Sequence, residues 1–232
     1  MSLAAMLVLG FLLGVRHATD ADHVVAVSTI VSRQRLLGAA LPIGVAWGLG
    51  HTVTIVLVGG AIIVFGVVVP PRLGLGLEFA VALMLVLLGA WNLKNLSRRT
   101  PQEPSHGHEH VEADTSLARA QPRRSLRPFM VGVVHGLAGS AAIALLVLGV
   151  IPSPSWALAY LLIFGVGTLV GMVVMTTAFA LPVAVAARRC TRLHRSLCVA
   201  TSVGSVLFGA FLTYDIGFVH GLFSERVEWT PE

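Results

Sequence analysis

The chain has 232 residues, of which 56% are hydrophobic and only 12% are charged. A soluble domain carries roughly 25% charged residues, so this composition and the mean hydropathy of +0.85 exclude an ordinary soluble domain and indicate a polytopic membrane protein. The formal net charge of +5 would favour nucleic-acid binding in a soluble protein. Here it indicates membrane orientation instead, because the basic residues cluster in particular loops.

Apolar stretches long enough to cross a bilayer, which takes ~20 helical residues, follow one another along the chain. The first is not a signal peptide, since it lacks a basic n-region and the apolar pattern resumes after a polar cluster at residues 16–23. The second is too long for a perpendicular span, so we expect it to be tilted or broken near Gly48-Leu49-Gly50. The fold class is therefore all-α, with six transmembrane helices predicted at about residues 3–31, 39–69, 75–96, 128–151, 155–187 and 196–223.

Residues 97–126 interrupt this pattern with a polar, proline-containing stretch that we expect to be a disordered loop. The loop contains three closely spaced histidines, His106, His108 and His110. They are candidates for metal capture at the membrane surface, and a solvated polar run is the equal alternative. Cys190 and Cys198 are spaced like neither a zinc ribbon nor a redox motif, and we assign them no role.

Basic residues predict the topology of the helices. The loops after the first, third and fifth predicted helices hold two, seven and four basic residues, counting Lys94, whereas the loop after the second holds only Arg72 and the loop after the fourth holds none. Because cytoplasmic loops are enriched in Lys and Arg, the odd-numbered loops should be cytoplasmic and both termini should lie outside. The protein is therefore expected to be a multi-pass membrane protein.

The two halves of the sequence resemble each other at offsets of 118, 117 and 120 residues. Three helices in each half is an odd number, so the second half must be inverted relative to the first, an architecture typical of secondary transporters with a midplane site. The predicted division is a first repeat over 1–96, the loop over 97–126 and a second repeat over 127–232. The matching segments are Gly14-Val15-Arg16-His17 with Gly132-Val133-Val134-His135, Gly48-Leu49-Gly50 with Gly165-Val166-Gly167, and Gly89-Ala90-Trp91 with Gly209-Ala210-Phe211.

Four ionisable side chains, His17, Asp20, Asp22 and His23, lie within seven residues between two apolar runs, at membrane depth. A charged side chain at a lipid-exposed helix centre costs roughly 2.5–3.5 kcal/mol, so this cluster needs water, other helices or a cation as its partner. On a regular helix, His17, Asp20 and His23 span about 120° of one face and Asp22 lies roughly 100° beyond. Either Asp22 contacts the other three side chains without facing the same cavity, or the helix is unwound here.

The residue types of the cluster favour a metal site. Imidazole with carboxylate and no thiolate suits a borderline divalent cation such as nickel, cobalt, copper or zinc. His51, after the glycine pair of the second predicted helix, is the best candidate for a ligand or gate from another helix, and His135 follows by its repeat position. A packing role is the alternative for both. Arg16 is expected to neutralise Asp20 or Asp22, and which aspartate is the nearer ligand stays open.

The segment Arg16-His17-Ala18-Thr19-Asp20-Ala21-Asp22-His23 resembles the signature of the nickel/cobalt transporter family, His-x4-Asp-His preceded by Arg. The segment Gly48-Leu49-Gly50-His51-Thr52-Val53 is similar to that family's second motif, a Gly-His pair in the next helix. The resemblance is close over the first two helices and extends to the rest by pattern, as in the shorter six-helix members. It implies uptake of Ni²⁺ or Co²⁺, although some relatives with long His-rich loops export these metals.

The first hypothesis is therefore a secondary transporter for Ni²⁺ or Co²⁺, working by uptake, with the ion bound by His17, Asp22 and His23 and assisted by Asp20 and His51. The metal is cargo rather than a cofactor, and no phosphate-binding loop indicates ATP use. We expect no enzymatic activity and no nucleic-acid partner. The alternatives are an exporter of the same metals and an intramembrane hydrolase that uses the same residues to activate water.

Overall fold

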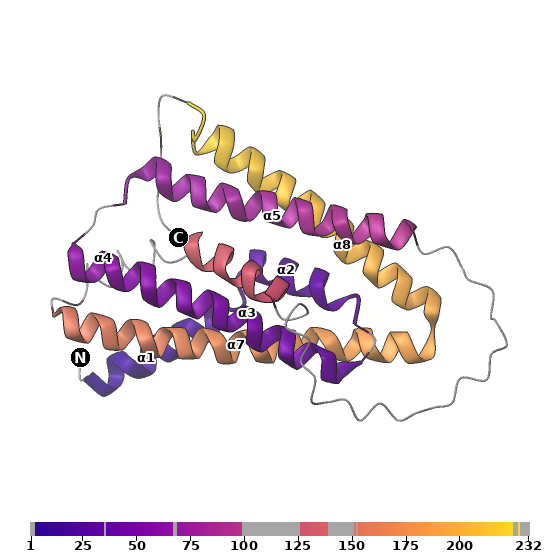
Figure 1. The fold of residues 1–232 in the computed structure, drawn as a ribbon, viewed down its shortest axis with the longest axis horizontal. Coiled ribbons are helices and arrows are strands. Elements are labelled where there is room, and N and C mark those ends of the chain that lie inside the picture. The colour runs from indigo at the N-terminus through magenta and orange to yellow at the C-terminus, as the bar shows by residue number, and fades with distance from the viewer. Residues whose placement is uncertain are drawn as a thin grey trace.

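The computed structural model describes residues 3–34, 36–66, 69–98, 126–138, 151, 153–224 and 227. Every regular element within these residues is a helix. Figure 1 shows an elongated bundle in which α1, α5 and α7 run in one direction, while α3 with α4, and α8, run back. The elements are α1 (Leu3–His17), α2 (Ala21–Val31), η1 (Leu37–Ala39), α3 (Ala40–Thr54), η2 (Ile55–Gly59), α4 (Gly60–Phe65), α5 (Pro71–Ser97), the helix Leu126–Ala138, α7 (Pro154–Arg189), α8 (Thr191–Tyr214) and η3 (Asp215–Val219).

The described helices confirm a polytopic membrane protein. Four continuous helical segments are long and apolar enough to cross a membrane, and the bent pair of α1 and α2 can count as a fifth span. The helix Leu126–Ala138 covers only the first part of the predicted span 128–151, whose remainder lies outside the described residues, so six helices remain a prediction. The four segments are Leu37–Phe65, Pro71–Ser97, Pro154–Arg189 and Thr191–Val219.

The prediction of one continuous helix over residues 3–31 is wrong. It is broken between His17 and Ala21, and the two parts, α1 and α2, meet at a bend of 54°. The reason is local: the Thr19 hydroxyl donates to the backbone oxygen of Arg16 at 2.6 Å, and Asp20 adopts an extended conformation with ψ of 150°. Short polar side chains of this kind compete with the helical hydrogen bonds of the backbone.

The second predicted helix differs from expectation in where it is irregular. The predicted break near Gly48-Leu49-Gly50 is absent, since α3 continues regularly through these residues to Thr54. The irregularity follows immediately as a π-helical turn, η2, before α4 ends at a left-handed Gly66 with φ of 62°. The glycines at 48 and 50 instead serve close packing, as described below.

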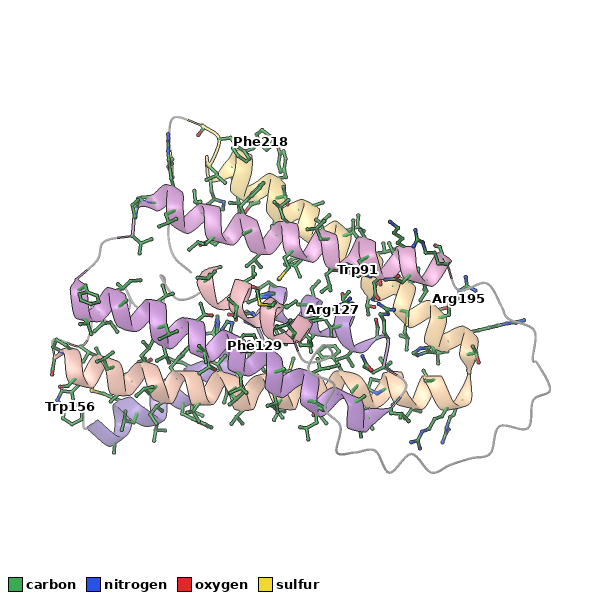
Figure 2. The ribbon with its side chains drawn as sticks, viewed as in Figure 1. Trp91, Arg127, Phe129, Trp156, Arg195 and Phe218 are labelled. Carbon is green, nitrogen blue, oxygen red and sulfur yellow. The ribbon has the colours of Figure 1, made fainter. Side chains whose placement is uncertain are left out.

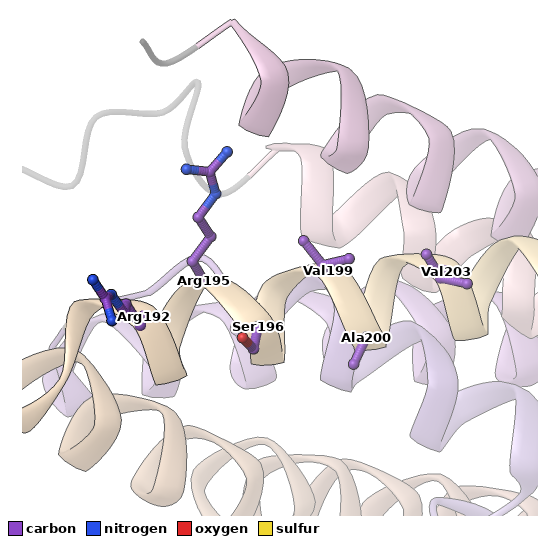
Figure 3. A pocket seen from close by; sticks show the side chains of 6 residues that line it. All are labelled: Arg192, Arg195, Ser196, Val199, Ala200 and Val203. Atoms are coloured by element: carbon purple, nitrogen blue, oxygen red, sulfur yellow. The ribbon is translucent and has the colours of Figure 1, made fainter. Parts of the chain in front are cut away.

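The predicted loop of four arginines after the fifth helix is also corrected. Only Cys190, in an extended conformation, separates α7 from α8, so Arg192 and Arg195 lie in the first turns of α8 rather than in a loop (Figure 3). Arginine is a good helix former, and the apolar pattern used to place the helix begins only at residue 196. These arginines still lie at an end of the helix, where the side chains can reach water.

Four glycines allow the backbones of neighbouring helices to touch. A Cβ added to Gly14 would overlap the carbonyl oxygen of Phe164, and one added to Gly132 would overlap the carbonyl oxygen of Trp47. Similar overlaps would occur between Gly167 and Phe11, and between Gly50 and Phe129. Such small-residue contacts are how membrane helices approach closely, and they hold α1 against α7 and the helix Leu126–Ala138 against α3.

These glycine contacts are reciprocal between the halves of the chain. Gly132 follows Gly14 by 118 residues, and their contact partners Phe164 and Trp47 are 117 residues apart in the opposite order. A second pair of glycines shows the same relation. Gly89 lies against the carbonyl oxygen of Ser202, and Gly209 lies against that of Ala82. The two glycines are 120 residues apart, and so are their two contact partners. The contacts made by one half are thus repeated by the other.

The packing predicts a clear contrast between two glycine substitutions. Gly132→Ala should destabilise the protein by about 1–3 kcal/mol, the usual cost of overpacking, because the new Cβ overlaps the Trp47 carbonyl. Gly204→Ala, in α8 with nothing within 4 Å, should be neutral or gain up to ~1 kcal/mol from helix propensity. Thermal unfolding in detergent measures both, and equal shifts for the two variants would contradict the packing described here.

Candidate metal centre

The break between α1 and α2 decides how the polar cluster is arranged. His17 is the last residue of α1 and Asp20 caps the N-terminus of α2, so the two parts of the cluster belong to different helices. The amides of Thr19 and Asp20 donate to the carbonyl oxygens of Arg16 and His17 in a turn. The unwound alternative of the sequence analysis is therefore the observed one, and side chains on both sides of the break can reach one space.

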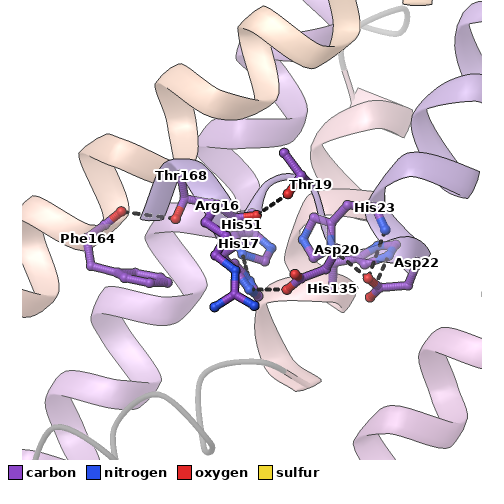
Figure 4. A network of polar contacts seen from close by, with 10 residues as sticks. All are labelled: Arg16, His17, Thr19, Asp20, Asp22, His23, His51, His135, Phe164 and Thr168. Atoms are coloured by element: carbon purple, nitrogen blue, oxygen red, sulfur yellow. Dashed lines mark hydrogen bonds and ion pairs between the residues drawn. The ribbon is translucent and has the colours of Figure 1, made fainter. Parts of the chain in front are cut away.

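His17 lies between a carboxylate and a second imidazole (Figure 4). Its Nδ1 lies 2.7 Å from Oδ2 of Asp20, and its Nε2 lies 3.2 Å from Nε2 of His51, a completely buried residue of α3. Because a carboxylate only accepts hydrogen bonds, His17 Nδ1 carries the proton and, in the neutral ring, Nε2 has a free lone pair. A carboxylate that holds a histidine in this way is typical of metal sites.

His23 repeats this arrangement from the first turn of α2. Its Nδ1 lies 2.8 Å from Oδ1 of Asp22, which also accepts the backbone N–H of His23 at 2.9 Å. Its Nε2 is buried and has no hydrogen-bond partner within the described part of the chain. The ring centroid of His23 is 4.8 Å from that of His17 and 5.0 Å from that of His51, so three imidazoles from three helices meet at this point.

His135, on the helix Leu126–Ala138, approaches the cluster from the opposite side of His23. Its ring centroid lies 4.9 Å from that of His23, and its Nε2 lies 3.6 Å from Oδ2 of Asp22. Its Nδ1 faces the carbonyl oxygen of Val131 at 3.3 Å and donates to it. His135 is only 2% exposed, so this contact lies deep in the bundle.

Two groups of side chains in this cluster have the geometry to hold a metal ion. One consists of His17, His23 and His51, and the other of Asp22, His23 and His135; within each group the candidate ligand atoms lie within 4.8 Å of one another. His23 belongs to both groups. Imidazole-rich sites with carboxylate support suit nickel, cobalt, copper and zinc, as the residue types alone predicted.

Aromatic rings enclose the cluster, and the sequence analysis did not identify them. Trp47 stacks on His23 with centroids 5.7 Å apart, and Phe164 of α7 lies 5.6 Å from His17. Trp47 precedes His51 by four residues, which places both on one face of α3, and that spacing could have identified it. No comparable signal marked Phe164, because α7 meets the cluster only through tertiary packing.

The remaining predicted residues are Arg16 and the three histidines of the loop over 97–126. Arg16 is exposed, and no salt bridge joins it to Asp20 or Asp22 among the contacts of the described residues, so the predicted neutralising role has no support. The histidines at 106, 108 and 110 lie outside the described residues. A groove of about 640 Å³ on α8, lined by Arg192 and Val199 among others, contains none of the cluster residues (Figure 3).

Comparison with known proteins identifies the family. Residues 5–204 match the family described as the cytochrome c biogenesis protein transmembrane region. The chain is also 36% identical to the urease accessory protein UreH of Bacillus sp. (strain TB-90) over 221 residues, which cover 95% of this chain and 96% of that protein. No solved structure matches.

Neither relative is named for a catalytic activity, in agreement with the expected non-enzymatic role. The similarity extends along nearly the whole of both sequences, and the family match includes the break between α1 and α2 and the four histidines of the cluster, His17, His23, His51 and His135. The chain is therefore a polytopic membrane protein that belongs to the cytochrome c biogenesis protein transmembrane-region family and to the same family as the urease accessory protein UreH.

Proposed function

We propose that this protein is a secondary transporter that imports Ni²⁺ or Co²⁺ across the bacterial cytoplasmic membrane. One observation carries the proposal: three imidazoles from α1, α2 and α3 meet at a helix break inside the bundle. Nε2 of His17 and Nε2 of His51 lie 3.2 Å apart, and Nε2 of His23 is buried without a hydrogen-bond partner in the described structure. Polar groups at membrane depth mark substrate pathways rather than packing. Broken membrane helices are tolerated where they line such a pathway.

The family relationship favours nickel among the metals that imidazole binds. A relative named as a urease accessory protein covers nearly the whole chain, and urease is a nickel-dependent enzyme. The motif around His17 and His23 resembles that of nickel/cobalt transporters and supports the same choice. Ligand chemistry alone would also admit copper and zinc. The name of the relative and the motif together favour nickel or cobalt over these two metals.

An inverted repeat supports transport over a static metal site. The reciprocal contacts of Gly14 and Gly132, and of Gly89 and Gly209, relate the two halves. In Figure 1, α3 runs opposite to its counterpart α7, and α5 runs opposite to its counterpart α8, as expected for two halves of three helices with opposite orientation. Transporters with this symmetry expose a central site alternately to the two sides by rocking one repeat against the other.

The distribution of basic residues supports the proposed orientation. Arg127 and Arg195 lie toward the same end of the bundle in Figure 2, and Trp156 lies at the opposite end. Arg188 and Arg189 close α7 at the basic end, after a helix that begins beside Trp156. We therefore assign the basic end to the cytoplasm. With this assignment both termini lie outside, and import corresponds to movement of the ion from α1 toward α2.

Nickel uptake by cells that express the full chain tests the function. His17→Ala and His51→Ala should each reduce uptake at least tenfold, because each removes an imidazole from the group that meets at the break. His220→Ala is the matched control, since this half-exposed histidine pairs with Asp215 at 3.2 Å at the far end of the last helical segment. Uptake should be unchanged in the control, with all proteins at equal levels.

Each other outcome of the uptake experiment has a definite meaning. Lower net accumulation with the wild-type chain than without it, relieved by His51→Ala, would reverse the direction and make the protein an exporter of the same metals. Equal accumulation with and without the protein would remove the transport proposal.

Asp20 provides a test of how the imidazoles are held. Asp20→Asn should weaken nickel binding to the purified protein by about 10–100-fold, the usual effect of losing a carboxylate that orients a metal-binding histidine. The reason is that Asp20 fixes the proton on Nδ1 of His17 and leaves Nε2 for the ion. Calorimetric titration measures the affinity, with Asp215→Asn as the control. An unchanged affinity would contradict this role for Asp20.

Proton coupling can be tested in proteoliposomes. Metal binding displaces protons from histidine, and three imidazoles adjoin the proposed site. We therefore expect nickel flux to respond to an imposed pH gradient or to membrane voltage. Flux that ignored both would leave the metal gradient as the sole driving force.

A further inference from the structure

A second metal position lies next to the one used above. Asp22, His23 and His135 form their own group of candidate ligands, which shares only His23 with the group of His17 and His51. The carboxylate of Asp22 connects its members, since Oδ1 lies 2.8 Å from Nδ1 of His23 and Oδ2 lies 3.6 Å from Nε2 of His135. This second group draws on the helix Leu126–Ala138, which contributes nothing to the first.

The contact between Asp22 and a neutral His135 is unfavourable unless a proton or a metal ion lies between the two side chains. The Nδ1 of His135 donates to the carbonyl oxygen of Val131 at 3.3 Å, so in the neutral ring its Nε2 carries a lone pair. This lone pair is buried without a hydrogen-bond donor in the described part of the chain, and it faces a carboxylate oxygen. Two electron-rich atoms this close repel each other unless a positive ion lies between them.

His23 lies between the two positions. Its ring centroid is 4.8 Å from that of His17 on one side and 4.9 Å from that of His135 on the other. Because Nδ1 of His23 donates to Asp22, the neutral ring offers one lone pair, on Nε2, and can bind one ion at a time, so the positions are alternatives for a single ion. His17 and His135 also occupy equivalent positions in the two halves, 118 residues apart, as expected if each serves one side of a pathway.

We propose that one metal ion passes from a first position at His17, His23 and His51 to a second position at Asp22, His23 and His135, with His23 as a ligand in both. The inference rests on the proposed transport function and adds the path of the ion within the site. The order of the two positions follows from the proposed import direction, from α1 toward α2, because His17 ends α1 whereas Asp22 lies in the first turn of α2. No bond other than metal coordination changes along the path.

Two variants separate the two positions. In purified full-length protein, Co²⁺ serves as the probe, because its visible absorption spectrum depends on its ligands. The wild-type protein should bind one Co²⁺. His135→Ala should bind one Co²⁺ with a wild-type spectrum and an affinity within about threefold, and this binding also shows that the variant is folded. His51→Ala should bind one Co²⁺ about tenfold more weakly, with a changed spectrum from the second group of ligands.

Flux completes the test. In proteoliposomes, His135→Ala should lower nickel flux at least tenfold although its binding is intact, whereas His220→Ala should change neither quantity. Equal loss of Co²⁺ binding in His135→Ala and His51→Ala would mean a single site with four histidines and would overturn the proposal. Unchanged flux in His135→Ala, or two Co²⁺ bound to the wild-type protein, would overturn it as well.

Failure of the transport function would give a different result. Wild-type protein that binds one Co²⁺ but carries no nickel flux would remove the proposed function. In that case, a changed spectrum in His51→Ala would still support the second position, and loss of all Co²⁺ binding in His51→Ala would remove it.

Discussion

Direct contact between helix backbones is the constraint on which the rest of this structure depends. Gly14 brings α1 against α7, and Gly132 brings the helix Leu126–Ala138 against α3. Gly50 makes the reciprocal contact next to His51, and Gly132 lies three residues before His135. Helices separated by large side chains could not bring these imidazoles to ring distances near 5 Å, so the small residues position the polar cluster.

The polar cluster is costly in the absence of a ligand. Leaving a buried polar atom without a hydrogen-bond partner costs about 1–3 kcal/mol, and His23 Nε2 and His51 Nδ1 are two such atoms in the described structure. Ordinary packing would replace such groups with apolar side chains. The cation proposed above would satisfy these lone pairs, and carboxylates at the Nδ1 atoms of His17 and His23 would orient both rings toward it.

The two halves share their packing but differ in their chemistry. The contacts of Gly14 and Gly132 correspond, yet Thr168 occupies the position in α7 that His51 occupies in α3. Thr168 donates to the carbonyl oxygen of Phe164 within its own helix and offers no imidazole to the cluster. The reciprocal glycine packing is therefore not matched by the polar residues, and within the described residues the second half contributes a single histidine, His135, to the cluster.

Periodicity and composition predicted the membrane class, the approximate spans and the residues of the cluster, because lipid demands long apolar helices and penalises each charge within them. The motif around His17 also singled out four side chains, His17, Asp20, Asp22 and His23, that the structure brings into contact. Their arrangement depended on other features: the Thr19 hydroxyl and the extended Asp20 break the helix, and no apolar pattern reports a local hydrogen bond of this kind.

The sequence by itself placed His17, Asp20, Asp22 and His23 between two apolar runs, and therefore predicted membrane depth for them, with His51 as a candidate from the next helix. Only the tertiary structure decided that the carboxylates hold Nδ1 atoms, that Trp47 and Phe164 enclose the rings, and that His135 joins through Asp22. The physical reason is that each of these contacts depends on how closely separate helices approach, and backbone contacts at glycines set that distance.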